Sequence, residues 1–141
     1  MAAINPYLHF NGNAEEAFHF YASVFGGSPD IRYYKQAPQE NKMDGADDEK
    51  VMHASLSIGD NTMLMASDLP SAYGTAIPGN NFYISFSTAG DDEAEKIFGA
   101  LSKGGQVMMP IEKTFWASRF GMCKDKFGIQ WMVGTENAEN N

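Results

Sequence analysis

Two histidines lie in strand-like segments of this chain, and imidazole suits proton transfer because it titrates near neutral pH. His53 shares one face of the alternating segment 51–58 with Ser55, and His9 lies in an apolar segment near the N-terminus. On a cleft wall, either histidine could act as a general base or a hydrogen-bond donor. The alternative is a structural histidine, hydrogen-bonded to a neighbouring strand or to a dimer partner. His19 falls outside the apolar stripe of its segment, so we expect it to face solvent.

Nucleophilic chemistry finds less support in the sequence. The one cysteine, Cys123, has no Cys or His at metal-site spacing beside it and cannot form an intramolecular disulfide. We expect a strand cysteine packed in or beside the core, as free cysteines usually are. No Ser-His-Asp arrangement is readable from the spacing. Proton transfer by His53 or His9 is therefore the chemistry that the residue types favour.

The elements that must position these residues repeat along the chain. Segment 13–27 has apolar residues at helical spacing between acidic residues and a Gly pair, and segment 90–105 repeats the pattern. We expect Asn13 with Glu16 to cap the first helix and the Gly pair to end it. The predicted buried stripes are Ala17, Phe20, Tyr21 and Val24 in the first helix and Ala94, Ile97, Phe98 and Leu101 in the second.

Segments with alternating side chains surround both helices and predict strands. A short apolar strand precedes the first helix. The later strands are expected at 31–35, 51–58 and 62–67, then at 81–87 before the second helix and at 106–109, 115–123 and 129–133 after it. The predicted fold class is α+β, with two βαβββ modules at about 1–75 and 76–135 in a single domain, and a polar tail at 135–141.

Neither module can cover both faces of its sheet alone. We expect the two sheets to pair into one curved mixed sheet with a concave cleft and with the helices outside. Alternation assigns the apolar faces to the helices and leaves the other face for the cleft. The cleft candidates are His9, His53, Ser55, Met65, Ser85, Gln130 and Met132. A concave, largely apolar wall with a few polar groups is the usual form of a small-molecule site.

Aromatic and sulfur-containing side chains allow two interpretations. Trp116, Phe120 and Trp131 could pack in the core or provide a stacking surface for a planar ligand, and core packing is favoured for Trp131. Six strand methionines are expected to fill the core as adaptable side chains, and the alternative is a deformable ligand pocket. They are Met63, Met65, Met108, Met109, Met122 and Met132. The polar segment 36–50 is either a lid or a solvated loop without a role.

Composition argues against several classes of protein. The net charge of −8 comes without the Lys and Arg clusters on which nucleic-acid binding depends. No apolar stretch reaches the roughly 18 residues of a membrane span, and the N-terminus lacks a basic region followed by an apolar signal core. We therefore expect a cytoplasmic protein with neither nucleic acid nor a membrane as its partner.

Several segments together resemble the PhnB-like branch of the vicinal oxygen chelate superfamily, which includes glyoxalases, bleomycin-resistance proteins and dioxygenases. The resemblance lies in the opening segment 6–13, in segments 52–54 and 65–68, and in the closing segments. The closing segments read Thr114-Phe115-Trp116-Ala117 and Asp125-Lys126-Phe127-Gly128-Ile129-Gln130-Trp131-Met132. The resemblance implies a homodimer with a cavity in each curved sheet. Superfamily members include isomerases, lyases, ring-cleaving dioxygenases and non-catalytic drug-binding proteins.

The resemblance also indicates where a metal would be bound. The ligand positions of metal-dependent members correspond approximately to His9, Met65, Ser85 and Met132, and only His9 is a good ligand. Thioethers are poor partners for hard divalent ions, so we expect no metal site of the superfamily type. We expect no cofactor either. A methyltransferase label sometimes accompanies this family, but the sequence lacks the Gly-rich strand-to-helix turn that binds a nucleotide-like cofactor.

Two classes of function stay open at this point. The first is a metal-independent enzyme that acts on a small organic substrate, with His53 or His9 handling a proton. The second is a binding or sequestering protein of the bleomycin-resistance type, whose cavity needs no reactive group. The sequence slightly favours the first, a glyoxalase-like protein whose particular activity the sequence does not assign.

Overall fold

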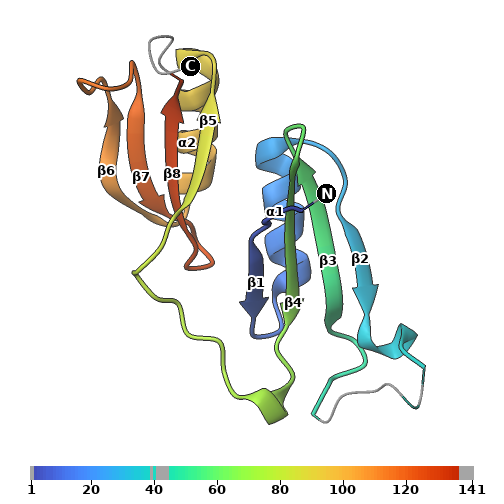
Figure 1. The fold of residues 1–141 in the computed structure, drawn as a ribbon. Coiled ribbons are helices and arrows are strands. Elements are labelled where there is room, and N and C mark those ends of the chain that lie inside the picture. The colour runs from blue at the N-terminus through green and yellow to red at the C-terminus, as the bar shows by residue number, and fades with distance from the viewer. Residues whose placement is uncertain (1, 39, 41–44, 137–141) are drawn as a thin grey trace. The chain divides into compact units, whose positions relative to one another are not determined.

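The computed structural model describes residues 2–38, 40 and 45–136, which form two compact units (Figure 1). Unit 1 runs from Met1 to Ile77 and unit 2 from Pro78 to Asn141. Each unit contains one long helix and one four-stranded mixed sheet in the order strand, helix, three strands. The predicted α+β class with two βαβββ modules is therefore confirmed. The pairing of the two sheets into one concave surface, and their union in a single domain, stay predictions.

Unit 1 contains strand β1 (Tyr7–Phe10), helix α1 (Ala14–Phe25), and strands β2 (Asp30–Tyr33), β3 (Val51–Ile58) and β4 (Thr62–Asp68). The strand order is β1-β4-β3-β2. Strand β1 is parallel to β4, whereas the other neighbours are antiparallel. The crossover through α1 thus brings the first strand of the module beside its last strand.

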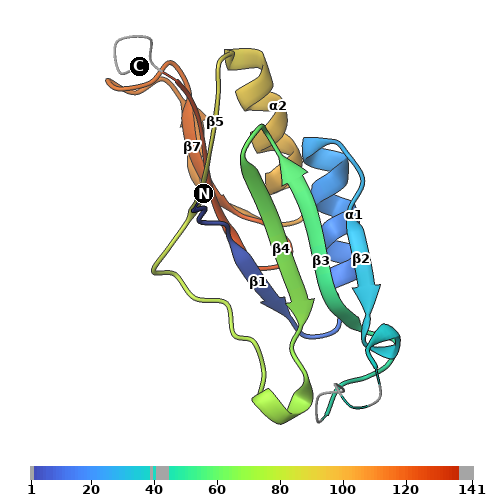
Figure 2. The ribbon, with the colours of Figure 1, turned by 45° about the vertical axis from the view of Figure 1, so that its right-hand side comes forward.

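Unit 2 repeats this topology with strand β5 (Ile84–Thr88), helix α2 (Asp91–Ser102), and strands β6 (Gln106–Glu112), β7 (Phe120–Lys124) and β8 (Gln130–Thr135). The order is β5-β8-β7-β6, with β5 parallel to β8. Figure 2 shows that the helix of each unit lies along one side of that unit's own sheet. No helix in the described part of the chain is long and apolar enough to cross a membrane.

The helices bury the faces that their periodicity indicates, with one shift. In α2 all four predicted residues, Ala94, Ile97, Phe98 and Leu101, are buried. In α1 the buried set is Ala14, Ala17, Phe18 and Tyr21, whereas the predicted Phe20 and Val24 are only half-buried. The spacing is the predicted one, but the stripe starts three residues earlier and runs from Ala14 to Tyr21.

The N-terminus of α1 is capped by a residue that is distant in sequence. The Asn13 side chain makes no capping hydrogen bond, so the predicted cap is wrong. Instead, the buried carboxylate of Asp68 accepts hydrogen bonds from the backbone N–H groups of Gly12 (2.9 Å), Ala14 (3.0 Å) and Val51 (2.9 Å). Asp68 thereby joins the β1–α1 turn to the start of β3. The predicted helix end is confirmed, since Gly26 and Gly27 have positive φ angles.

A second buried carboxylate explains the motif of the β7–β8 turn. Asp125 accepts hydrogen bonds from the backbone N–H groups of Phe127 (2.8 Å) and Ile129 (3.1 Å) and from the indole N–H of Trp131 (2.9 Å). Trp131 is 1% exposed, which confirms its predicted core position. The Asp-Lys-Phe-Gly-x-x-Trp segment is thus a structural turn that ties a buried indole to its own hairpin.

Several strand boundaries differ from the sequence prediction. The strand expected at 81–87 begins only at Ile84, and the strand expected at 129–133 extends to Thr135. The strand expected at 31–35 ends at Tyr33, because residues 34–36 form a 3-10 turn. The strand expected at 115–123 begins only at Phe120, because Thr114 and Ala117 hydrogen-bond to each other and close a turn. The strand expected at 106–109 extends to Glu112. Of the predicted lid and tail, residues 39, 41–44 and 137–141 lie outside the described residues.

Candidate functional site

Within each unit, the helix packs on one face of that unit's sheet. In unit 1, Leu8, Ala54, Leu56, Leu64 and Ala66 are buried on the face that packs against α1. In unit 2, Cys123, Trp131 and Val133 occupy the corresponding face against α2. Side chains alternate along strands, so the intervening residues lie on the opposite face. We call this opposite face the open face of each unit.

The open face of unit 1 brings the two predicted histidines together through a tyrosine. The Tyr7 phenol oxygen lies 3.3 Å from Nδ1 of His53. The Tyr7 ring centroid lies 5.6 Å from that of His9 and 5.7 Å from that of His53. Sequence reasoning missed Tyr7, although its position two residues before His9 in β1 could have revealed it. His53 is half-buried, whereas His9 and Tyr7 are exposed.

Three further residues complete this cluster. Tyr7 stands opposite Met65, and Met65 stands opposite Ser55, so the three form one row across β1, β4 and β3. His9 stands opposite Ser67, whose hydroxyl oxygen lies 3.4 Å from Nδ1 of His9. The predicted residues His9, His53, Ser55 and Met65 therefore share one surface, to which the structure adds Tyr7 and Ser67.

The Tyr7–His53 pair can support proton transfer in either direction. A phenol hydroxyl can donate or accept, and a neutral imidazole carries its proton on one nitrogen only. When Tyr7 donates to Nδ1, Nε2 of His53 carries the proton and can act as an acid or a hydrogen-bond donor. When Nδ1 donates to Tyr7, Nε2 presents a lone pair and can act as a base. The third histidine, His19, is exposed beside Glu15, as predicted.

The open face of unit 2 has a different chemistry. Ser85 stands opposite Met132, and Met132 stands opposite Met122. Along β7 from Met122, Phe120 lies on the same face and contacts the Trp116 ring in a T-shaped arrangement at 5.3 Å. The predicted residues Ser85, Trp116, Phe120 and Met132 thus belong to one largely apolar surface. Gln130 is buried, and its side-chain amide donates a hydrogen bond to the Phe82 carbonyl (2.8 Å).

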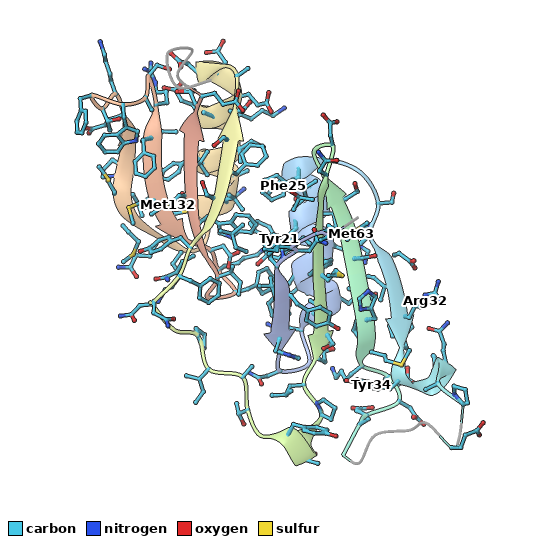
Figure 3. The ribbon with its side chains drawn as sticks, in the orientation of Figure 1. Tyr21, Phe25, Arg32, Tyr34, Met63 and Met132 are labelled. Carbon is cyan, nitrogen blue, oxygen red and sulfur yellow. The ribbon has the colours of Figure 1, made fainter. Side chains whose placement is uncertain are left out.

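The methionines are not the core filling that the sequence favoured. None of the six strand methionines is buried, and Met63, Met108 and Met109 are 36%, 45% and 36% exposed. Figure 3 labels two of them, Met63 in unit 1 and Met132 in unit 2. The prediction is wrong because the helix of each unit packs on one face of that unit's sheet, and these side chains lie away from it. The alternative interpretation, a deformable surface, fits their position.

The donor atoms present do not fit a divalent metal of the superfamily type. Among the described residues, no group of three or more His, Cys, Asp or Glu side chains could hold a metal ion. Of the four corresponding positions, Met65, Ser85 and Met132 offer thioether or hydroxyl groups, which bind hard ions weakly. His9 is the only imidazole among them, and its Nδ1 already faces Ser67.

Two other features that often carry chemistry serve structural roles here. The backbone N–H groups at the start of α1, where an anionic cofactor group would bind, point to the carboxylate of Asp68. A second anion there would be repelled by that charge. Cys123 is fully buried, as predicted, and burial raises the pKa of its thiol. A raised pKa lowers the thiolate fraction and makes this cysteine a poor nucleophile.

Two βαβββ units with one open sheet face each define the vicinal oxygen chelate fold, and the chain falls in its PhnB-like branch. It belongs to the family described as 3-demethylubiquinone-9 3-methyltransferase, whose model matches residues 2–134. The resemblance seen in the sequence is therefore confirmed. Solved structures of glyoxalase/bleomycin-resistance proteins share the fold.

Three relatives illustrate the family. The crystal structure of protein PA1353 from Pseudomonas aeruginosa is 41% identical, covers 96% of this chain and 98% of its own, and superposes with a TM-score of 0.85. A putative 3-demethylubiquinone-9 3-methyltransferase, PhnB protein, from Bacillus cereus is 25% identical over 95% and 99% of the two chains, with a TM-score of 0.73. Protein YjdN of Escherichia coli is 27% identical over 139 residues, or 92% of each chain.

Proposed function

We propose that this glyoxalase-like protein binds a small organic molecule and that His53, supported by Tyr7, transfers a proton to or from it without a superfamily-type metal. The observation that carries the proposal is the 3.3 Å contact between the Tyr7 hydroxyl and Nδ1 of His53. In this proposal, Nδ1 of His53 contacts Tyr7 and Nε2 faces the ligand. His9, which contacts the same Tyr7 ring, is the second candidate for proton transfer.

Each open face, taken by itself, offers residues for holding a small molecule. In unit 1, Ser55 and Met65 lie one row away from His53 and offer a hydroxyl and an apolar contact. In unit 2, Met132, Trp116 and Phe120 would contact apolar or planar parts of a ligand, with Ser85 as a polar group among them. Gln130 would support this surface by holding the Phe82 backbone rather than by touching the ligand.

Methyl transfer, which the family description names, is not the reaction that we propose. A methyl donor of the nucleotide type would need N–H groups at a strand-to-helix turn. In the β1–α1 turn, the N–H groups of Gly12 and Ala14 already donate to Asp68. The β5–α2 turn has a single glycine, Gly90, and is therefore not the Gly-rich turn that binds such a donor. Proton transfer on a bound small molecule needs no donor cofactor.

The alternative proposal is a binding or sequestering protein of the bleomycin-resistance type. It is favoured by the unit 2 open face, where the candidate residues are apolar or weakly reactive. In either case we propose a cytoplasmic homodimer. The alternative differs from the first proposal in one respect, since it needs no proton transfer by His53 or His9.

The two proposals are separated by a ligand screen followed by four variants. A small-metabolite library is screened by thermal shift against the wild-type chain, and each hit is tested for binding and for turnover. For the enzyme, His53→Ala should abolish turnover and retain binding, and Tyr7→Phe should reduce turnover. The control is His19→Ala, which removes an exposed histidine outside the cluster. Tight binding with no product would support the binding or sequestering protein. Unchanged binding and turnover in both His53→Ala and His9→Ala would refute the roles of these histidines.

A further inference from the structure

Four methionines lie in one line across strands β6, β7 and β8 of unit 2, where the edge strand β6 has a bulge. Val107 stands opposite Cys123 and Met109 opposite Met122, so one extra residue, Met108, lies between two successive pairs. In such a bulge, two residues of one strand oppose one residue of the other. Met108 and Met109 therefore both stand against Met122.

The same line continues into the next strand. Met122 stands opposite Met132 in the antiparallel β7–β8 pair. Neighbouring strands lie about 4.8 Å apart, so the outer strands of this line are about 10 Å apart. Methionine has three rotatable side-chain bonds, so thioethers on either side can lean toward Met122. Four sulfur atoms can thus reach one point above β7.

The exposure of these side chains argues against a packing role. Met108 and Met109 are 45% and 36% exposed, and Met122 and Met132 are half-buried. The only other side chain in the line is Ser85, opposite Met132, so the line holds no carboxylate and no imidazole. Thioether sulfur is a soft ligand that selects Cu(I) and discriminates against hard ions.

We propose that Met108, Met109, Met122 and Met132 form a binding site for a soft monovalent cation, Cu(I) or its analogue Ag(I). The site uses none of the proton-transfer residues proposed for unit 1. It shares Met132 with the ligand surface proposed for unit 2 and with the superfamily ligand positions, but its thioethers select a soft ion rather than a hard divalent one. The β6 bulge supplies two of the four ligands, which a regular strand could not place opposite the same partner residue.

The site is tested on the full chain carrying ¹³C-methyl-labelled methionine. One equivalent of Ag(I), and then Cu(I) kept reduced under anaerobic conditions, should shift the methyl resonances of the four methionines and leave those of Met63 and Met65 in place. Met122→Leu, which nearly conserves volume, should abolish the shifts. Met109→Leu, at an exposed position, should also abolish the shifts. Met63→Leu is the matched control, because Met63 has the same 36% exposure as Met109 but stands opposite Ser57.

Cys123 is the competing soft ligand, since it lies in β7 beside Met122 but on the buried face. The methyl shifts should persist in Cys123→Ala, and one equivalent of Zn(II) should leave the methyl spectrum unchanged. Loss of the shifts in Cys123→Ala would overturn the proposal and assign the ion to the thiol. Absence of shifts at one equivalent, or equal shifts at Met63 and Met65, would overturn it as well.

Discussion

Replacing Asp68 should destabilise the fold far more than replacing the residue that precedes α1 in sequence. The Asp68 carboxylate accepts three hydrogen bonds from backbone N–H groups, at 2.9, 3.0 and 2.9 Å, and the residue is 3% exposed. Asn13, at the N-cap position, makes no side-chain capping bond. The variants Asp68→Ala, Asp68→Asn and Asn13→Ala therefore separate a long-range cap from a local one.

The magnitudes follow from the hydrogen bonds. A hydrogen bond to a charged group contributes about 1.5–3 kcal/mol, but three bonds that share one carboxylate are not additive. We expect Asp68→Ala to lower the free energy of unfolding by about 4 kcal/mol. Asp68→Asn keeps one acceptor oxygen but turns an NH₂ group toward a backbone N–H, so we expect about 2 kcal/mol. Asn13→Ala should cost less than about 0.5 kcal/mol.

These differences are measured by urea unfolding, with far-ultraviolet circular dichroism as the signal. The signal reports on both units because each contains helix and sheet. Amide hydrogen exchange adds site resolution, since the N–H groups of Ala14 and Val51 should lose protection in Asp68→Ala and keep it in Asn13→Ala. A loss below about 1 kcal/mol for Asp68→Ala would refute this reasoning. So would an equal loss in Asn13→Ala, because the cap would then be local.

Three further predictions concern unit 2. Gly121→Ala should lower the free energy of unfolding by about 1–3 kcal/mol, because its Cβ would lie 2.7 Å from Cε1 of Phe98. The control is Gly99→Ala, where no atom lies within 4 Å of the added Cβ, and this change should stabilise α2 by about 0.5–1 kcal/mol in the same urea titration. Asp125→Asn should cost about 2 kcal/mol, because the buried indole N–H of Trp131 loses a charged acceptor, and an unchanged urea midpoint would contradict this. Burial raises the pKa of Cys123 above 9.0, so the folded state keeps the thiol proton where the unfolded state releases it. The stability that the protonated thiol contributes should be complete below pH 9 and should fall as the pH rises through the folded-state pKa. The free energy of unfolding, measured from pH 8 upward, should therefore decrease with pH. This decrease should be smaller in Cys123→Ala.

Local periodicity was sufficient to predict the elements and most of the core. The α2 stripe follows from apolar spacing alone, and the turns at Gly59 and Gly128 follow from residues that adopt positive φ readily. The predictions failed where the deciding contact was long-range. The α1 cap comes from Asp68, which lies 54 residues after Ala14, and no local pattern marks it.

In the candidate site too, the local pattern predicts which face a residue lies on, whereas the contacts between strands depend on the fold. Alternation along β1 and β3 predicts that His9 and His53 lie on the face away from α1. It cannot predict that Tyr7 lies against both rings, because that contact depends on β1 and β3 both lying beside β4. The six strand methionines were expected in the core because their side chains are apolar and adaptable, although alternation also placed Met65 and Met132 on the cleft face. The structure buries none of the six.

The central claim is that a small molecule binds on the open face of unit 1, around His53. The most direct test is a ¹⁵N–¹H spectrum of the labelled full chain titrated with the strongest hit of the thermal-shift screen. We predict saturable shifts at Tyr7, His9, His53 and Ser55, and loss of the His53-centred shifts in Tyr7→Phe because the hydroxyl orients the ring. Shifts confined to α1, α2 or the turns, with the signals of Tyr7, His9 and His53 unchanged at saturation, would contradict the claim.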